Sequence, residues 1–202
     1  MRPLDVFQPG LVRGSASLPF DPEKAYAYVE HPTEGWRVYL RTASFLYDRS
    51  QPFEKGHFLV VKKRDAPTWE PPKGQMEGSV FRGNKNKPLL DLLKQTALRE
   101  IAEESFVTHV THLEPTGLIY QQKEKDYPPN HFFQYHLFTG LVSPKQVEAA
   151  FDMFEWIQTH PKAFARFTRD RREKDAIAWF SKKTRLNPRW CLAIVRLFLR
   201  SV

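Results

Sequence analysis

Three carboxylates lie close together in the segment ALREIAEESF, residues 97–106. In a helix, Glu100 and Glu104 are one turn apart and Glu103 lies beside both. Like charges at this spacing destabilise a helix by about 0.3 kcal/mol per pair, so a neutralising cation is expected. Magnesium and manganese prefer carboxylate oxygens as ligands. The cluster therefore points to a divalent-metal site, and the alternative is a solvated acidic face.

The segment that carries these carboxylates has the hydrophobic pattern of a helix. Apolar residues recur at positions 89, 90, 93, 97, 98 and 101, which fits one helix face. Pro88 suits the start of such a helix. The sequence therefore predicts one helix that begins near Pro88 and carries all three glutamates.

Strand-like patterns occur on both sides of this helix. Residues 36–48 alternate, and shorter apolar or alternating runs cover 57–64, 115–122, 131–142 and 174–181. The segment APTWEPPKGQMEG is rich in proline and glycine and is expected to be a loop. Residues 188–200 predict an amphipathic closing helix. The expected fold class is α/β.

Two parts of the chain carry weaker patterns. Residues 1–35 are rich in proline and are expected to be an N-terminal arm, with a short strand or helix around 22–30. Residues 151–167 mix both hydrophobic periods and predict no single element. The predicted domain spans 36–202 and includes a basic inserted loop at about 79–88.

Composition limits the class of protein. The 202 residues are enough for one sizeable domain, and 41% apolar residues allow a core. Cys191 is the single cysteine, which rules out an internal disulfide and is compatible with a reducing compartment. No apolar run approaches the roughly 20 residues of a membrane span, and the N-terminus lacks the apolar region of a secretory signal. We expect a cytoplasmic protein without a membrane partner; a nuclear or organellar location and the oligomeric state stay open.

The run REIAEE resembles the signature of the Nudix hydrolases, G-x5-E-x7-R-E-U-x-E-E-x-G-U, in which U is a bulky apolar residue. The matching positions, from the opening glycine onward, are Gly74, Asp91, Arg99, Glu100, Ile101, Glu103 and Glu104. The resemblance covers roughly residues 36–180. It implies an α/β/α sandwich around a mixed β-sheet.

This chain departs from the signature in three ways. Asp91 stands in place of a glutamate, and sixteen residues (75–90) rather than five separate it from Gly74. The short Asp91 side chain is expected to weaken the brace that it forms with Arg99. Phe106 stands where a glycine ends the helix, which predicts a different cap because a positive φ favours glycine. None of these changes removes a metal-binding carboxylate.

The resemblance implies roles for the remaining residues. Glu100, Glu103 and Glu104, with the carbonyl group of Gly74, would hold Mg²⁺ or Mn²⁺. Glu103, Glu104 and a late glutamate would be catalytic. Glu173 is favoured as the late glutamate because it stands six residues before Trp179, and Glu148 and Glu155 are its rivals.

Other residues are expected to bind the substrate. The WEPPKG loop is similar to that of asymmetric diadenosine tetraphosphate hydrolases, in which the lysine that matches Lys73 would contact phosphate, and Glu77 matches a glutamate of the same loop. Tyr127 and Tyr135 offer rings on which a base can stack. The inserted loop adds a basic rim that consists of Arg82, Lys85 and Lys87.

Net charge is relevant to the choice of substrate. The excess of 31 Lys and Arg over 23 Asp and Glu gives +8, which attracts polyanions such as nucleotides and RNA. The leading substrate is a dinucleoside polyphosphate, such as diadenosine tetraphosphate. An RNA 5′ end, capped or triphosphorylated, comes second, and an inositol pyrophosphate comes third. A non-catalytic Nudix-fold module that binds RNA or protein is the alternative from another class.

Overall fold

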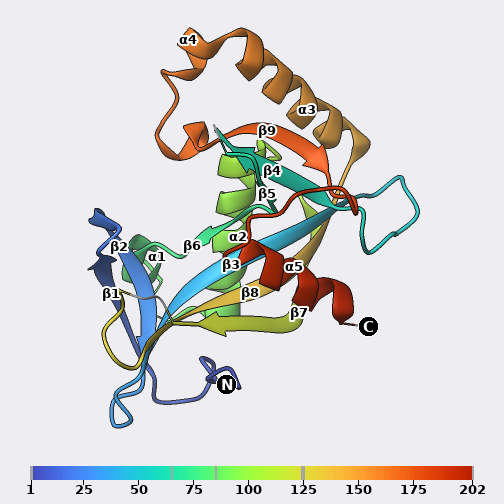
Figure 1. The fold of residues 1–202 in the computed structure, drawn as a ribbon. Helices are drawn as coiled ribbons and strands as arrows, with labels where there is room; N and C mark the ends of the chain where they lie inside the picture. Colours follow the sequence, from blue (N-terminus) through green and yellow to red (C-terminus); the bar gives the residue numbers. More distant parts are fainter. Residues whose placement is uncertain (1, 65, 85, 124–125, 202) are drawn as a thin grey trace.

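The computed structural model describes residues 2–64, 66–84, 86–123 and 126–201 and has a six-stranded mixed sheet at its centre (Figure 1). The strand order is β1-β2-β3-β8-β7, and β6 pairs with β3 beside this path. The strands are β1 Val12–Leu18, β2 Asp21–Glu30, β3 Arg37–Asp48, β6 Lys73–Gln75, β7 Thr111–Gln122 and β8 His131–Val142. Of the pairs, β3 and β8 are parallel and the others are antiparallel.

A second, smaller sheet lies above the first one in Figure 1. Its order is β5-β4-β9, and both of its pairs are antiparallel. These strands are β4 Leu59–Lys63, β5 Trp69–Glu70 and β9 Lys174–Trp179. The segment expected to be a loop, residues 66–78, therefore contributes a short strand to each sheet.

Side chains of the central strands alternate between two cores. In β3, Leu40 and Leu46 face one core, whereas Tyr39 and Phe45 face the other. In β8, Phe138 faces the same core as Leu40, and Phe133 faces the same core as Tyr39. Because both faces are buried, these strands are apolar on both sides.

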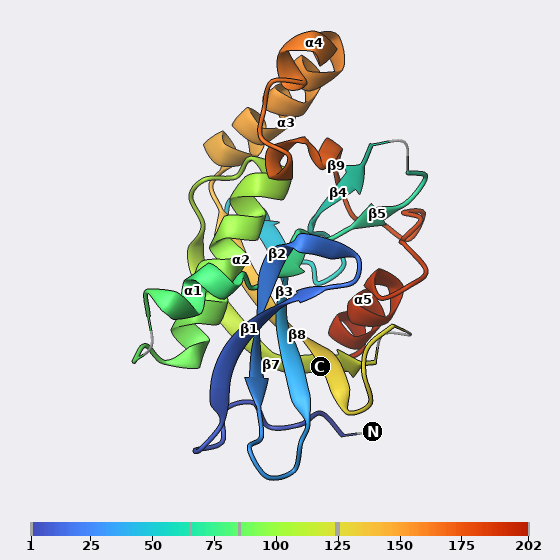
Figure 2. The same cartoon turned by 90° about the vertical axis from the view of Figure 1, so that its left-hand side faces the viewer.

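Helices cover both faces of the main sheet (Figure 2). The helix α2, Leu89–Ser105, and α3, Pro144–Thr159, belong to one core, and α5, Cys191–Arg200, belongs to the other. Shorter helices are α1 Gly78–Arg82, α4 Pro161–Phe164 and the 3-10 turn η1 Asp170–Arg172. The expected α/β class, with helices on both sides of a mixed sheet, is confirmed. No described helix is both long and apolar enough to cross a membrane.

The first 35 residues differ from the expectation of a wrapping arm. Residues 12–30 form a hairpin, β1 and β2, that extends the main sheet beyond β3. Of the two alternatives predicted around 22–30, the short strand is confirmed by β2, whereas β1 was missed because few of its residues are buried. Residues 151–167, which predicted no single element, lie in the second half of α3, in α4 and in the turn that follows it.

The end of α2 also differs from the expectation. Phe106 caps the helix in the left-handed conformation, with φ 59° and ψ 10°. The prediction of a different cap was therefore wrong: the chain keeps the geometry that usually takes glycine. The Phe106 ring packs against the rings of Phe154 and Phe167, with centroid distances of 5.2 and 6.3 Å. This packing stabilises a conformation that a side chain at position 106 otherwise disfavours.

Candidate active site

The helix α2 carries two of the predicted metal-binding glutamates on its buried face. Buried positions recur along the helix from Leu92 through Thr96 to Glu100 and Glu104. The side chains of Glu100 and Glu104 continue this stripe at its C-terminal end, where it reaches the pocket. Glu103 lies beside them and is half-buried. The helix thus brings the three carboxylates to one place, as expected from their spacing.

Gly74 lies directly against the Glu100 carboxyl group. The strand β6 pairs with β3 through Gly74 and Thr42, which fixes the main chain at this position. A Cβ atom on residue 74 would lie 2.0 Å from the Glu100 Cδ atom, so a side chain at this position would displace the Glu100 carboxyl group. Gly74 and Glu100 are therefore adjacent, as the signature implies, and metal ligation by the Gly74 carbonyl stays a prediction.

Arg99 orients the neighbouring carboxylates. Its Nη1 atom donates to Glu103 Oε2 at 2.7 Å, and its Nη2 atom donates to Glu100 Oε1 at 2.5 Å and to the Gln75 carbonyl oxygen at 2.8 Å. Glu77 Oε1 lies 3.6 Å from the same guanidinium group. Arg99 therefore links Gln75 of β6, and Glu77 two residues beyond that strand, to the carboxylates of α2.

Asp91 does not take part in this arrangement. It is exposed in the first turn of α2, and no ion pair joins it to Arg99 among the described residues. The separation of eight positions corresponds to about 12 Å along a helix, which is too far for direct contact. The predicted brace by Asp91 is therefore corrected: Glu77 contacts Arg99 instead.

A second group of charges lies behind Glu104. Its Oε2 atom accepts the Lys73 main-chain N–H at 2.8 Å, and its Oε1 atom lies 2.8 Å from Lys174 Nζ. Lys174, the first residue of β9, also contacts Glu70 and, at 3.2 Å, Glu173 Oε1. Glu173 is therefore close to Glu104, as the prediction of a late glutamate requires.

The charges of this group follow from their surroundings. Burial raises the pKa of Glu100 to about 8, with a contribution from Glu104 and against the opposing effect of Arg99. Burial also raises the pKa of Glu104 to about 7, although Lys174 and Lys73 oppose it. Burial acts in the same direction on Glu70, but Lys73 and Lys174 outweigh it and lower that pKa to about 2.

Lys174 and Glu173 are both charged at neutral pH. Burial disfavours the Lys174 ammonium group, but Glu104 and Glu70 outweigh this effect and raise its pKa above the ordinary value. The pKa of Glu173 is lowered by Lys174 and Lys73 against the effect of burial. Glu173 is half-exposed at the edge of the pocket and can accept a proton.

These residues fit a divalent cation. Glu100 is buried beside two other glutamates, and Arg99 is its one cationic partner among the described residues. A divalent ion in the pocket would lower the pKa of Glu100 and offset the mutual repulsion of the three carboxylates. Glu100, Glu103 and Glu104 all line the same pocket, together with Gly74.

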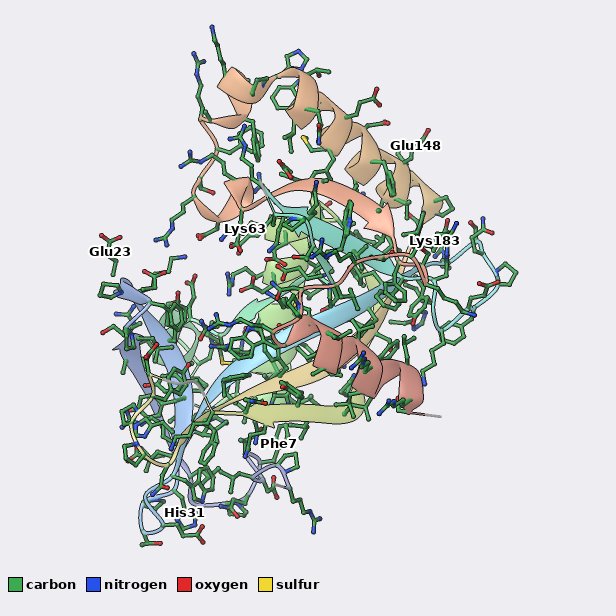
Figure 3. All side chains as sticks on the ribbon, viewed as in Figure 1. Phe7, Glu23, His31, Lys63, Glu148 and Lys183 are labelled. Carbon is green, nitrogen blue, oxygen red and sulfur yellow. The ribbon has the colours of Figure 1, made fainter. Side chains whose placement is uncertain are left out.

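The pocket has a volume of about 580 Å³ and is rimmed with cations. Its basic lining residues are Lys24, Arg41, Lys63, Lys73, Arg99, Arg169 and Arg189. Lys63 stands at the end of β4 and extends toward this space (Figure 3). Tyr135 and Trp190 contribute aromatic rings, and the Arg189 guanidinium group lies 4.8 Å from the Trp190 ring centre. The pocket therefore combines carboxylates, cations and aromatic rings, and among its cations Lys24 is already paired with the lining carboxylate Asp170 and Arg169 with Asp21.

Not every predicted substrate residue lines this pocket. Lys73 and Tyr135 do. Tyr127 is buried beneath it, where its hydroxyl group accepts a hydrogen bond from Arg41 at 3.2 Å. Arg82 is exposed at the end of α1 and is not among the lining residues. Lys87 is exposed as well, and Lys85 lies outside the described residues.

The rivals of Glu173 are far from the carboxylate cluster. Glu148 and Glu155 are exposed on α3, and neither lines the pocket. Figure 3 shows Glu148 on the outer side of that helix.

Sequence reasoning missed Glu70, Lys174, Arg41 and Trp190. Glu70 and Lys174 are 104 positions apart and meet because β5 and β9 both pair with β4. Arg41 is a charged residue within an apolar strand, and its guanidinium group lies over the Phe133 ring at 4.2 Å. A charge inside an otherwise apolar strand was the available signal for a functional residue.

Comparisons with known proteins found matches among solved structures alone: no protein-family model and no curated protein matches the chain. A NUDIX hydrolase from Nitrosomonas europaea is 15% identical, with 80% of this chain and 88% of that chain covered and a TM-score of 0.42. A MutT NUDIX hydrolase from Burkholderia pseudomallei is 14% identical, with 79% of this chain and 97% of that chain covered and a TM-score of 0.42. The NUDIX domain of Shewanella oneidensis NrtR, complexed with ADP ribose, is 14% identical, with 79% of this chain and 84% of that chain covered and a TM-score of 0.44. At these identities and TM-scores the likeness assigns neither a family nor an activity to this chain.

Proposed function

We propose that this protein is a Nudix-type hydrolase that cleaves a pyrophosphate bond in a nucleoside polyphosphate with the help of Mg²⁺ or Mn²⁺. The observation that supports it best is the meeting of Glu100, Glu103, Glu104 and Glu173 in a pocket that basic side chains also line. The carboxylates suit divalent ions, and the cations suit the phosphate groups of the substrate.

Each residue has a role in this proposal. Glu100, Glu103 and Glu104 would hold a divalent ion, which would neutralise charge at phosphate and lower the pKa of a bound water. Arg99 keeps Glu100 and Glu103 in position through its hydrogen bonds. Glu173 accepts the proton of the attacking water, since it is ionised and reaches the pocket.

Lys73 is the proposed phosphate contact nearest to the metal-binding carboxylates. Its ammonium group has Glu70, at 3.2 Å, as its carboxylate partner among the described residues. An ammonium group has three N–H donors, so others are left for phosphate oxygens. Its main-chain N–H meanwhile holds Glu104.

The leading substrate is a dinucleoside polyphosphate such as diadenosine tetraphosphate. Tyr135 and Trp190 line the pocket and offer faces for a base, with Arg189 beside the indole ring. An RNA 5′ end is the second candidate, because Lys24, Lys63 and Arg169 extend the positive rim around the same pocket.

The test is hydrolysis with Mg²⁺ or Mn²⁺ across diadenosine tetraphosphate, capped RNA, 5′-triphosphate RNA, ADP-ribose and an inositol pyrophosphate. The double variant Glu103→Gln, Glu104→Gln is expected to lose roughly 10²-fold or more in kcat/KM. The matched control is Glu148→Gln with Glu155→Gln, since these exposed glutamates lie outside the pocket. If the wild type cleaves none of these substrates yet binds RNA, the chain is a non-catalytic binding module and the proposal fails.

A further inference from the structure

Three carboxylates form a cation-sized site behind the metal-binding helix. Glu70, Glu104 and Glu173 each offer one carboxylate oxygen, and these oxygens all lie within 4.8 Å of one another. Glu70 comes from β5, Glu104 from α2, and Glu173 from the residue before β9. Such a convergence of oxygen ligands from separate elements suits a divalent ion.

The Lys174 ammonium group already occupies this site. Its Nζ atom lies 2.8 Å from Glu104 Oε1 and 3.2 Å from Glu173 Oε1, and it also contacts Glu70 Oε1. The Lys174 side chain is 1% exposed. An ammonium group has three N–H donors, and here each one has a carboxylate acceptor.

We propose that Lys174 is a built-in cation that takes the place of one divalent ion in this cluster. It supplies a permanent positive charge next to Glu104 and Glu173, and divalent ions are confined to the side of Glu104 that faces Glu100 and Glu103. The consequence for catalysis depends on the proposed hydrolase function, whereas the cation site itself does not. In that reaction Lys174 is a positioning residue, since it acts through Glu104 and Glu173.

The surroundings hold Lys174 in this position. The pairing of β4 and β9 shifts register between Lys62 and Lys63, so that Lys63 pairs with Lys174 beyond the irregularity. Such an irregularity re-aims the side chains beside it. The other oxygen of Glu70 is held by Cys191, whose Sγ atom donates to Oε2 at 3.2 Å, and by Lys73 at 3.2 Å.

Both oxygens of Glu104 have protein donors. Oε1 is bound by Lys174 and Oε2 by the Lys73 main-chain N–H. Glu100 and Glu103, in contrast, have Arg99 as their one ion-pair partner among the described residues. A divalent ion is therefore expected on the Glu100 side of the cluster. Glu104 would then contact both this ion and Lys174.

The first test counts bound Mn²⁺ ions by the loss of the free Mn²⁺ signal in electron paramagnetic resonance. Lys174→Ala is expected to bind one more Mn²⁺ per chain than the wild type, and Mn²⁺ should raise its Tm by more. Lys183→Ala is the matched control, since Lys183 is exposed and lies away from the cluster (Figure 3). Equal Mn²⁺ stoichiometry in Lys174→Ala and the wild type would overturn the proposal.

A second measurement uses the wild-type chain, in case Lys174→Ala does not fold. In protein labelled with ¹⁵N-lysine, a buried and hydrogen-bonded ammonium group exchanges its protons slowly and gives a resolved NMR signal. The Lys174 signal is expected to persist at saturating Mg²⁺. Its loss, which would mean that the ion displaces the ammonium group, overturns the proposal. Both readouts are independent of turnover, so a chain that cleaves no substrate would refute the proposed function and leave the Lys174 site standing.

Discussion

The main chain of Gly74 packs against the carboxyl group of Glu100, at a distance that leaves no room for a Cβ atom. Two segments that are far apart in sequence thus meet where a divalent ion is expected. Because the obstructing atoms belong to the Glu100 side chain, an added methyl group displaces that carboxylate rather than the backbone.

The variant Gly74→Ala is therefore expected to fold and to bind Mn²⁺ about 10–100-fold more weakly, the usual cost of disturbing the surroundings of a metal ligand. Calorimetric titration with Mn²⁺ measures the affinity, and circular dichroism reports the fold. Gly56→Ala is the control, since a Cβ atom there meets no other atom within 4 Å. Unchanged Mn²⁺ affinity in Gly74→Ala would show that Mn²⁺ binding does not depend on the present position of the Glu100 carboxylate.

The left-handed cap at Phe106 sets a backbone effect against a packing effect. Replacement by glycine removes a conformational cost of about 1 kcal/mol. It also removes the ring that packs on Phe154 and Phe167, a loss of about 3 kcal/mol for a partly buried phenylalanine. Phe106→Gly is thus expected to lower the free energy of unfolding by about 2 kcal/mol in urea denaturation. A more stable variant would mean that backbone strain outweighs the ring contacts.

The buried contact between Glu70 and Lys174 is expected to be important for stability. Glu70→Gln removes the charge from one of the three carboxylates around the ammonium group, and breaking a buried pair from one side costs about 3 kcal/mol. Urea denaturation of this variant should show a loss of this order. The control Glu148→Gln changes an exposed glutamate and should alter stability by less than about 0.5 kcal/mol. A similar stability of the two variants would show that Lys174 is satisfied by Glu104 and Glu173 alone.

His136 makes stability depend on pH. Burial lowers its pKa to about 4, and among the described residues its Nε2 atom has no hydrogen-bond partner. The unfolded chain takes up a proton near pH 6.5, so the stabilising effect is complete above that pH and is lost as the pH falls toward 4. The loss is about 3 kcal/mol at most, given about 1.4 kcal/mol for each unit of pKa.

The variant His136→Asn should remove this part of the pH dependence. Subtracting the urea stability curve of the variant from that of the wild type, between pH 7 and 4, isolates His136 from the buried glutamates that titrate in a similar range. Parallel curves for the two proteins would contradict a neutral, buried His136.

Local sequence determined the helix that carries the clustered carboxylates. The spacing of Glu100, Glu103 and Glu104 is set by residues within two turns of each other, and the apolar positions of the same segment orient the helix on the core. The strands β3 and β8 were equally predictable, because residues 36–48 and 131–142 carry the alternating or apolar patterns of strands. A cytoplasmic location stays a prediction from composition.

Tertiary structure alone decided which charges meet. Lys174 and Glu70 come together because β5 and β9 both pair with β4, and Arg99 contacts Glu77 because the segment that includes β6 packs against α2. The hairpin of β1 and β2 likewise depends on the exposed edge of β3. Strand pairing joins residues at any separation along the chain, and the side chains of one segment do not specify the partner of that segment. For this reason the sequence determined the carboxylates that can hold a metal, and only the fold decided which lysine lies among them.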